Sequence, residues 1–558
     1  MKNRIRLAAG TAALFVLLTL TACMGEKGQG LFKGNRSSAL QNLYKSSQAK
    51  RINEAGIALE VDGKRNRLSG KGLVIMSDDM KLLIRADALN DIFKCCVSWQ
   101  DDGVDMSSHS EPDGSPDTDP DAGKTHLDFV EDSFIDAGQA AGALGYSLKW
   151  DEKERLMSLT SPQSRKKSLP ASFDLRDEGR VSPVSDQGSW GSCWAFAAVS
   201  CVESALLPDR QIKLSEDHLV HKNGFSVEGE GGDYNMALAY MAAWRGPVKE
   251  EDDPYGDGVS PENAKPAVHL QDAVILNNRD FDQIKRLVRD YGAVQTSIYC
   301  PQDAQSLAQY YNRKAAAFYC PQSRECNHDV NIVGWDDSYP AGNFKPAAAH
   351  DGAFICKNSW GEGFGDSGYF YISYDDPNIG IYGAAATGVE DTDNYARICQ
   401  SDLLGWTGSI GYDSPEAEFA CVYRAEKGES LAAAGFYSTA PDSWYDIYAV
   451  PDFQGVSSLE NASPVQSGYL AGKGYFTIKF DHPVKLAGGR KFALIVDIYT
   501  KGSKHPVAIE YRENKISQNA DISDGESYMS SDGRDWTRTE TDSDCNVCLK
   551  ACTKKAGQ

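Results

Sequence analysis

The stretch QGSWGSCWAF, residues 187–196, decides how the central part of this chain folds. It holds one thiol, Cys193, with Gly191 and Ser192 before it and the apolar, helix-like run WAFAAVSCVESALL after it. We therefore expect Cys193 in the first turn of a helix, where the helix dipole lowers the pKa of a thiol. A thiolate in that position is a strong nucleophile, so Cys193 is the first candidate for a reactive side chain.

The whole chain is long, acidic and otherwise ordinary in composition. Its 558 residues exceed what one hydrophobic core holds and predict roughly three to four domains. Hydrophobic residues make up 41% and charged residues 24%, as in soluble globular proteins. The formal net charge of −22 argues against a nucleic-acid partner, because nucleic acids are bound through clustered Lys and Arg.

The N-terminus has the features of an export signal. MKNRIR is a basic segment, and the apolar run LAAGTAALFVLLTL, 14 residues long, is too short to span a bilayer. The run ends in Leu20-Thr21-Ala22-Cys23, which resembles the lipobox of bacterial lipoproteins. This resemblance implies a signal peptide over residues 1–22, lipid attachment at Cys23 and an extracytoplasmic place on the bacterial cell membrane. An ordinary secretory signal that ends in cysteine is the alternative.

The other cysteines are interpreted in the light of that location. Cys23 and Cys193 aside, twelve remain of 14, an even number that disulfides outside the cell accommodate, although no pairing can be deduced from sequence. The candidates by proximity are Cys300, Cys320 and Cys326, and the C-terminal Cys545, Cys548 and Cys552. The last three lack a fourth ligand nearby, so disulfides or buried thiols are preferred to zinc. We expect neither a metal nor a cofactor.

Two segments precede the thiol motif. Residues 23–55 are polar and predict a linker from the membrane. Residues 56–167 predict a small α+β domain, serving as spacer or proregion. In it, strand-like alternation surrounds the turn Asp62-Gly63, and two helix-then-strand units end at Trp99 and Trp150. Residues 101–123 predict an acidic loop, in which Pro120 and a late glycine disfavour a calcium site. Cleavage at the basic cluster Arg165–Lys167 would separate the thiol domain from Cys23.

A histidine and an asparagine downstream complete a candidate site with Cys193. His328 begins an apolar, strand-like run in CNHDVNIVGWDD, and Asn358 lies in CKNSWGEGFGDSGYFYISY. Together with QGSWGSCWAF, these motifs resemble the papain family of cysteine peptidases, and the resemblance covers residues 168–392. It implies an α+β, papain-like two-lobed fold with a helical lobe and a β lobe. It also implies hydrolysis of peptide bonds by a cysteine-type endopeptidase.

The resemblance implies a role for each catalytic residue. Cys193 is the nucleophile, and His328 holds it as a thiolate–imidazolium pair and later gives a proton to the leaving amine. Asn358 accepts from the other ring nitrogen and orients the imidazole. Gln187, with the backbone N–H of Cys193, stabilises the oxyanion, where one such donor is typically worth about 3 kcal/mol.

Four further residues match substrate-binding positions of the family. Gly231 and Gly232 match the paired glycines that bind the substrate backbone, and Tyr234 would line the adjoining pocket. Trp360 would shield the bond between His328 and Asn358 from water.

The chain also departs from the family pattern. Trp190 stands where the family usually has a cysteine, and residues 223–232 lack the partner cysteine. Both cysteines of this disulfide are therefore missing, and we expect side-chain packing to stabilise this part of the thiol domain instead. An insertion is expected near SYPAGNFKPAAAHDG, between His328 and Asn358.

The C-terminal region, residues 396–555, has a different texture. Short aromatic and β-branched runs such as KFALIVDIY and HPVAIEYR are separated by Gly, Pro, Asp and Ser, which is typical of an antiparallel β-sandwich. The region resembles the lectin-like domain that comes after papain-type peptidases in some bacterial and archaeal surface proteins. A cell-surface glycan is therefore a candidate partner, although the domain's name alone does not imply sugar binding.

The function expected from these observations is that of a surface-anchored cysteine endopeptidase with protein or peptide substrates. One alternative is a surface adhesin or glycan-binding protein in which the peptidase domain is secondary. Another is a hydrolase of peptidoglycan peptides, which would use the same nucleophile.

Overall fold

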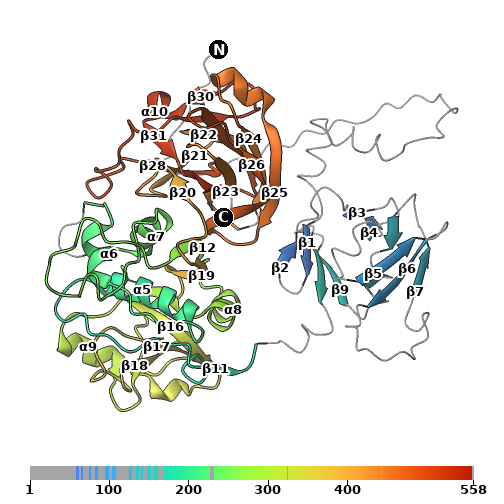
Figure 1. The fold of residues 1–558 in the computed structure, drawn as a ribbon. Coiled ribbons are helices and arrows are strands. Elements are labelled where there is room, and N and C mark those ends of the chain that lie inside the picture. The colour runs from blue at the N-terminus through green and yellow to red at the C-terminus, as the bar shows by residue number, and fades with distance from the viewer. Residues whose placement is uncertain are drawn as a thin grey trace. The chain divides into compact units, whose positions relative to one another are not determined.

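The chain divides into two compact units, residues 1–167 and 168–558, in this computed structural model (Figure 1). In the second unit the structure describes residues 169–226, 231–322, 324–441 and 443–555. In the first it describes ten strands and residues 140–141. The predicted signal peptide, the lipid-attachment residue Cys23, the linker and the basic cluster Arg165–Lys167 lie outside the described residues. None of the helices in the described residues has the length and hydropathy needed to cross a membrane.

The first unit contains three small sheets. One has the order β2-β1-β10-β9, built from β1 (Ala58–Val61), β2 (Lys64–Asn66), β9 (Ser147–Asp151) and β10 (Leu156–Thr160). The second has the order β3-β4-β8, built from β3 (Val74–Met76), β4 (Leu82–Arg85) and β8 (Phe134–Asp136). The third has the order β5-β6-β7, built from β5 (Cys95–Trp99), β6 (Gly103–Ser108) and β7 (Thr125–Asp128).

Two local predictions for this unit are confirmed and two are wrong. β1 pairs with β2, as the alternation predicted, and the second helix-then-strand unit ends in strand β9, which contains Trp150. Residues 134–136, expected in a helix, form strand β8, because Phe134 and Ile135 pair with the apolar strand β4. Residues 103–108, expected in the acidic loop, form β6, whose alternating GVDMSS pairs with Cys95–Trp99.

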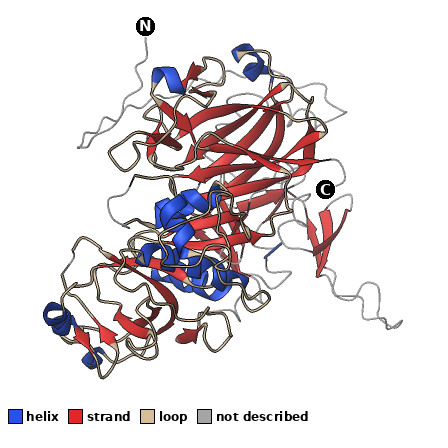
Figure 2. Ribbon diagram, turned by 60° about the vertical axis from the view of Figure 1, so that its left-hand side comes forward, coloured by secondary structure: helices blue, strands red, loops and turns tan. Residues whose placement is uncertain are grey.

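The second unit begins with a helical lobe. Its helices are α5 (Cys193–Leu206), α6 (Glu216–Lys222) and α7 (Tyr234–Ala242). Ser215 and Asp233 cap α6 and α7 by accepting backbone N–H bonds, which fixes where these helices begin. α5 is buried from Trp194 to Ser204 on all faces rather than on one inner side. In Figure 2 the helices of this lobe gather beneath the long strands of the C-terminal region.

A seven-stranded sheet forms the β lobe. Its order is β11-β16-β17-β18-β15-β14, with β13 also paired to β16. The strands are β11 (Ser172–Asp174), β13 (Val294–Ile298), β14 (Tyr311–Asn312), β15 (Ala317–Phe318), β16 (His328–Asp336), β17 (Ala353–Lys357) and β18 (Tyr369–Ser373). Two helices, α8 (Phe281–Tyr291) and α9 (Ala304–Tyr310), belong to the same lobe. The 3-10 helix η3 (Ala341–Asn343) lies in the stretch expected to be inserted.

α5 packs directly against β16. Asn331 in β16 donates its side-chain N–H to the carbonyl of Ala197 at 2.9 Å and to Sγ of Cys201 at 3.2 Å. The helix that starts with the thiol and the strand that starts with His328 are therefore held side by side.

The C-terminal region is built from antiparallel strands. One sheet has the order β25-β24-β27-β22-β29-β30, from β22 (Glu416–Arg424), β24 (Ser443–Val450), β25 (Ser463–Leu470), β27 (Lys491–Thr500), β29 (Ser527–Ser530) and β30 (Thr537–Arg538). A smaller sheet joins β21 (Gly408–Ile410), β28 (Val507–Tyr511) and β31 (Cys545–Val547). The C-terminal region also contains two short helices, η4 (Val456–Asn461) and α10 (Thr539–Asp542).

A fourth sheet of the second unit contains strands from the part of the unit that holds the two lobes and from the C-terminal region. Its order is β19-β12-β26-β23-β32-β20, from β12 (His269–Ile275), β19 (Ala384–Glu390), β20 (Arg397–Cys399), β23 (Glu429–Ser438), β26 (Gly474–Lys485) and β32 (Leu549–Lys555). β12 pairs with β26 at Asp272–Val274, and in Figure 1 β12 and β19 lie between the helices and the C-terminal strands. The two regions thus share a continuous hydrogen-bonded sheet.

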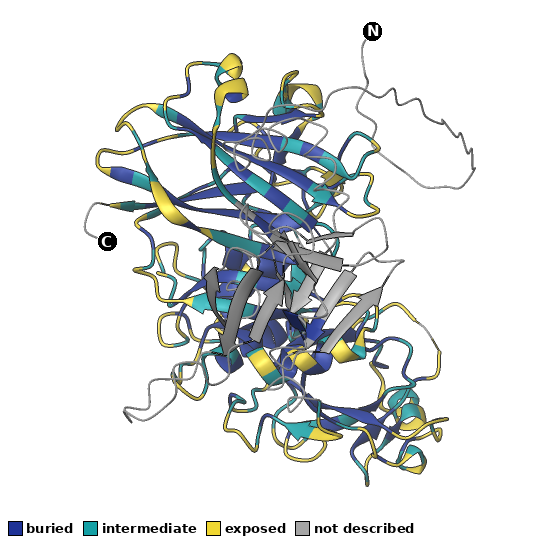
Figure 3. Cartoon of the chain, turned by 90° about the vertical axis from the view of Figure 1, so that its right-hand side faces the viewer, coloured by how far each residue is buried: buried dark blue, intermediate teal, exposed yellow. Residues whose placement is uncertain are grey.

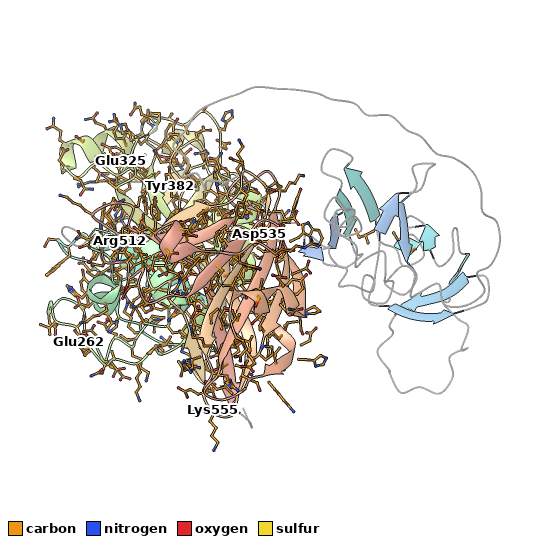
Figure 4. The ribbon with its side chains drawn as sticks, turned by 90° about the horizontal axis from the view of Figure 1, so that it is seen from above. Glu262, Glu325, Tyr382, Arg512, Asp535 and Lys555 are labelled. Carbon is orange, nitrogen blue, oxygen red and sulfur yellow. The ribbon has the colours of Figure 1, made fainter. Side chains whose placement is uncertain are left out.

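The two regions also share a hydrophobic core. Trp194 and Met236 of the helical lobe pack in the same cluster as Tyr437, Tyr475 and Cys548 of the C-terminal region. The long C-terminal strands are buried for much of their length (Figure 3). Charged residues such as Glu262, Asp535 and Lys555 lie at the periphery of the unit (Figure 4).

The eleven cysteines whose side chains the structure describes are free thiols. The disulfides that the sequence allowed, including those among Cys300, Cys320 and Cys326, are therefore not formed among these residues. Nine of the eleven are buried, so most of these thiols fill the core.

Candidate active site

Cys193 is the first residue of α5, as the sequence predicted. The hydroxyl of Ser192, at the N-cap, hydrogen-bonds to the hydroxyl of Tyr255 at 2.6 Å and does not cap the helix. In the first turn the backbone N–H of Ala195 donates to the carbonyl of Ser192 at 2.9 Å, whereas the N–H groups of Cys193 and Trp194 interact with the sulfur.

The thiol lies in a buried setting with mixed electrostatics. Burial raises the pKa of Cys193 to about 11, and the negative charge of Asp329 raises it as well. The backbone N–H groups of Asp329, Trp194 and Cys193 itself lower the pKa by stabilising the thiolate. Since Asp329 comes directly after His328, these contacts place the sulfur beside the first residues of β16.

His328 is held in one orientation by two neighbours. Its Nε2 lies 2.8 Å from Oδ1 of Asn358, and the ring of Trp360 stacks on it with centroids 4.7 Å apart. Oδ1 of Asn358 also accepts the backbone N–H of Ser359 at 2.8 Å, so it is an acceptor and Nε2 carries the proton. Nδ1 of the neutral imidazole is then the ring nitrogen able to take a proton.

Burial governs the charge of His328. Desolvation lowers the pKa of the imidazole to about 4, while the bond to Asn358 acts in the opposite direction. Burial therefore favours the neutral thiol of Cys193 and the neutral imidazole of His328, each considered by itself.

Asn358 comes directly after β17 and is 3% exposed. Its backbone N–H donates to the carbonyl of Gly368 at 3.0 Å, and this bond fixes the backbone from which the side chain extends. The residue before it, Lys357, donates from Nζ to Ser182 and Ser200 at 2.9 and 3.0 Å. Since Ser200 belongs to α5, the buried amine of Lys357 links the end of β17, next to Asn358, to the helix that begins with Cys193.

Gln187 is 6% exposed and engaged at both ends of its amide. Nε2 donates to the carbonyl of Trp190 at 2.7 Å, and Oε1 accepts the hydroxyl of Ser359 at 2.6 Å. Its backbone N–H donates to the carbonyl of Ser359 at 2.8 Å. Gln187 and Asn358, which are far apart in sequence, are thus joined through Ser359.

Three residues of this site were given no role in the sequence analysis. Ser359 was recognised only as a neighbour of Asn358, and Tyr255 lies in a segment without a predicted function. The hydroxyl of Tyr255 donates to the carbonyl of Gln187 at 3.0 Å. Asp329 was passed over beside His328, although an acidic residue at the head of an apolar strand is itself a signal worth noting.

Asp329 is a buried carboxylate next to the nucleophile. Its Oδ2 accepts Nε2 of Gln295 at 2.7 Å, and the same Nε2 donates to the carbonyl of Trp194 at 3.3 Å. Burial raises the pKa of Asp329 to about 6 against the effect of its hydrogen bonds. The charge that opposes thiolate formation is therefore itself lost below about pH 6.

Two of the predicted substrate-binding residues, Gly232 and Tyr234, lie next to the nucleophile helix α5, whereas Trp360 stacks on His328. Gly232 lies against the indole of Trp194, where an added Cβ would come within 2.4 Å of Cε2. Tyr234 begins α7 and lines a small cavity of about 30 Å³ together with Met241, Gln295 and Ala384. Gly231 is exposed. The structure thus places the Gly232 and Tyr234 segment next to the nucleophile helix.

One cluster of potential metal ligands occurs among the described residues. Carboxylate oxygens of Asp217, Asp253 and Asp257 lie within 4.8 Å of one another in the helical lobe. None of the three carboxylates is among the described hydrogen-bond partners of Gln187, His328 or Asn358.

Comparisons with known proteins identify both regions. Residues 169–389 match the papain family cysteine protease, and residues 398–553 match the lectin like domain. A viral cathepsin of Heliothis zea nuclear polyhedrosis virus is 31% identical over 211 residues, which cover 37% of this chain and 52% of the relative. Cysteine proteinase 15A of Pisum sativum is 32% identical over 219 residues, 37% of this chain and 58% of the relative. The chain thus spans little more than half the length of these relatives.

Solved structures resemble the second unit across both regions. The cysteine protease and lectin-like domains of Cwp84, a surface layer associated protein of Clostridium difficile, match with 25% identity and a TM-score of 0.60 over 70% of this chain and 90% of that one. Clostridial Cwp84 after propeptide cleavage matches with 25% identity and a TM-score of 0.61 over 69% and 99%. The predicted α+β class, with a papain-like peptidase and a C-terminal β domain, is confirmed. Residues 169–389 thus form a papain-family cysteine protease domain, and residues 398–553 form a lectin-like domain.

Proposed function

We propose that the chain is a surface-anchored cysteine endopeptidase that cleaves protein substrates through an acyl-enzyme on Cys193. One observation carries the mechanism: Asn358 holds the Nε2–H of His328 at 2.8 Å, which leaves Nδ1 as the base for a thiol at the start of α5. The family match of residues 169–389 supports the reaction class.

The reaction begins when Nδ1 of His328 takes the proton of Cys193 and the sulfur attacks the substrate carbonyl. A bond forms between Sγ and the carbonyl carbon, and the carbonyl oxygen becomes an oxyanion stabilised by Gln187 and the N–H of Cys193. The C–N bond then breaks as the imidazolium gives its proton to the leaving amine. A water molecule, deprotonated by the same ring, releases the acid and restores the thiol.

The proposed location is the outer face of a bacterial membrane, with the lipid on Cys23. The basic segment, apolar run and Leu20–Cys23 motif support it. The full chain, expressed in a lipoprotein-processing bacterium fed an alkyne fatty acid, should become labelled, and Cys23→Ala should not. Equal labelling of the variant would rule out the anchor. Release near Arg165–Lys167 predicts a cell-free form whose sequence begins near Ser168.

The activity is tested with the purified chain and Cys193→Ala, each offered casein, peptidoglycan and immobilised glycans. Casein hydrolysis that is lost with the thiol supports the endopeptidase. Release of peptidoglycan peptides without casein cleavage favours the cell-wall hydrolase instead. Glycan binding by both proteins without any hydrolysis favours the adhesin, for which the lectin-like domain is the supporting feature.

A further inference from the structure

The lectin-like domain holds the chain just before the paired glycines. The backbone N–H of Ser226 donates to the carbonyl of Ile516 at 2.8 Å. Gln518 donates from Nε2 to Oγ of Ser226 at 2.7 Å, and Asn519 donates from Nδ2 to the carbonyl of Gly224 at 3.2 Å. All three partners lie in residues 512–522, the loop after β28, which we name the 512–522 loop (Arg512, where it begins, is labelled in Figure 4).

An apolar contact reinforces these hydrogen bonds. Phe225 packs against a small cluster of the lectin-like domain, made of Leu404, Ala520 and Ile522, each at most 5% exposed. Gly224 has a φ of +92°, and an added Cβ there would lie 3.1 Å from Cδ2 of Leu404. The same Cβ would lie 2.1 Å from Nη1 of Arg245, so the positive φ and the contacts from both regions require a glycine at this position.

The peptidase region also contacts this segment, because Phe225 packs against the core cluster of the helical lobe that contains Leu219 and Val220. Arg245 donates from Nη1 to the carbonyl of Asn223 at 3.1 Å, and Asn223 accepts the N–H of Phe225 at 2.8 Å. From Gly224 to Ser226, the remaining hydrogen bonds described for the segment come from the 512–522 loop.

The other end of the segment reaches the nucleophile. The described chain resumes at Gly231, five positions after Ser226, and Gly232 lies against Trp194, the neighbour of Cys193. Asp233 then caps α7 through its bonds to the N–H groups of Asn235 and Met236 at 2.8 and 3.0 Å. Residues 223–232 contain no cysteine, so no disulfide fastens them. Because only five positions separate Ser226 from Gly231, fixing one of these residues limits where the other can lie.

We propose that the 512–522 loop is a positioning element for substrate binding, which fixes residues 224–226 and thereby holds Gly231 and Gly232 ready to receive the substrate backbone. This inference rests on the proposed peptidase function. On this proposal the lectin-like domain contributes to substrate binding. Holding Gly231 and Gly232 in place before the substrate arrives lowers the entropic cost of binding.

The test uses the full chain and two variants that remove the contacts from different sides. Gln518→Ala with Asn519→Ala deletes both side-chain hydrogen bonds, and Phe225→Ala deletes the apolar contact. We expect KM for a peptide substrate to rise about 10-fold in each, with kcat changed by less than about 2-fold. The rate at which iodoacetamide alkylates Cys193, measured by mass spectrometry, should stay the same, because this small reagent does not use the glycines.

Gln400→Ala is the matched control. Gln400 also crosses between the regions, donating from Nε2 to the carbonyl of Ala243 at 2.9 Å, but it does not touch residues 223–232. This variant should leave KM unchanged. An unchanged KM in both test variants, or an equal rise in Gln400→Ala, overturns the inference. A fall in the alkylation rate at Cys193 also overturns it, since the effect would then be general damage to the site.

Hydrogen exchange separates this inference from the proposed function. Amides of residues 223–226 should exchange at least about 10-fold faster in the double variant than in the wild type or in Gln400→Ala. If exchange is unchanged in the double variant, the 512–522 loop does not fix residues 224–226, whether or not the protein hydrolyses peptides. If the wild type hydrolyses no peptide but exchange is still faster in the double variant, the peptidase function is contradicted. The hold of the 512–522 loop on residues 224–226 is then still supported.

Discussion

Ser359 donates its hydroxyl proton to Oε1 of Gln187 at 2.6 Å and thereby links the oxyanion side of the site to the residue that orients the histidine. The same serine donates its backbone N–H to Oδ1 of Asn358 at 2.8 Å. One residue thus sets the position of two side chains from distant parts of the chain. Its own hydroxyl takes no part in the proposed chemistry, so Ser359 is a positioning residue.

Ser359→Ala should lower kcat by about 10-fold, because the amide of Gln187 loses the partner that holds it and its buried oxygen is left unsatisfied. Steady-state kinetics on a peptide substrate measures this. Ser359→Thr, which keeps a hydroxyl, should recover most of the loss. The alkylation rate of Cys193 should hardly change. Equal kinetics of the alanine variant and the wild type would show that Gln187 does not depend on this bond.

Asn358→Ala should lower kcat/KM by on the order of 10²-fold, because the imidazole of His328 loses the acceptor that fixes its tautomer. The loss also removes the contact that raises the pKa of His328, so burial is left less opposed and the ring becomes a weaker base. Trp360→Phe, which keeps a ring stacked on the imidazole, is the comparison and should cost much less. A similar loss in both variants would assign the effect to packing and not to the hydrogen bond.

How far the sequence predicts this site depends on how local each feature is. The start of α5 at Cys193 and the strand that begins at His328 are predicted by short patterns of apolar residues, and both are confirmed. The link through Ser359 is not local, because it joins positions 172 residues apart. The roles of Cys193, His328, Asn358 and Gln187 stay predictions until activity is measured.

The fold shows the same division. Alternation predicted the β1–β2 hairpin correctly, whereas β8 was mistaken for a helix because only its pairing with β4 makes it a strand. The shared sheet was not predicted at all. Its key pairing joins Ala273 of β12 to Tyr475 of β26, which lie about 200 residues apart, and sequence patterns near either strand carry no information about that choice of partner.

Asp329→Asn should make the thiol more reactive at neutral pH. Above about pH 6 the carboxylate is charged and raises the pKa of Cys193, so removing the charge moves thiolate formation to lower pH. The alkylation rate of Cys193 measured from pH 5 to 9 should rise several-fold near pH 7 in the variant. The two proteins should converge below about pH 6, where Asp329 is protonated. A profile unchanged at every pH would contradict the electrostatic account.

The same substitution has a consequence for stability. The pKa of Asp329 rises from 3.8 to about 6 on folding, so the native state binds more protons than the unfolded state between these values. The free energy of unfolding of the wild type therefore falls as pH rises from about 4 to about 6, and Asp329→Asn should lose this part of the dependence. Urea unfolding at pH 4.5 and pH 7 compares the two. Parallel pH dependence in both proteins would contradict the prediction.

Tyr475→Ala should destabilise the peptidase and lectin-like regions together. Tyr475 is 1% exposed, pairs with Ala273 across the shared sheet and contacts the ring of Tyr437 with centroids 5.1 Å apart. Deleting a buried aromatic side chain typically costs about 3–5 kcal/mol, and a common sheet and core transmit that loss to both regions. We expect one calorimetric transition in the wild type and one at lower temperature in the variant, with peptidase activity lost along the same curve. Val456→Ala, which truncates an exposed side chain of the lectin-like domain, is the control and should leave the transition in place. Two separate transitions, or activity that survives the unfolding of the lectin-like domain, would show that the regions are independent.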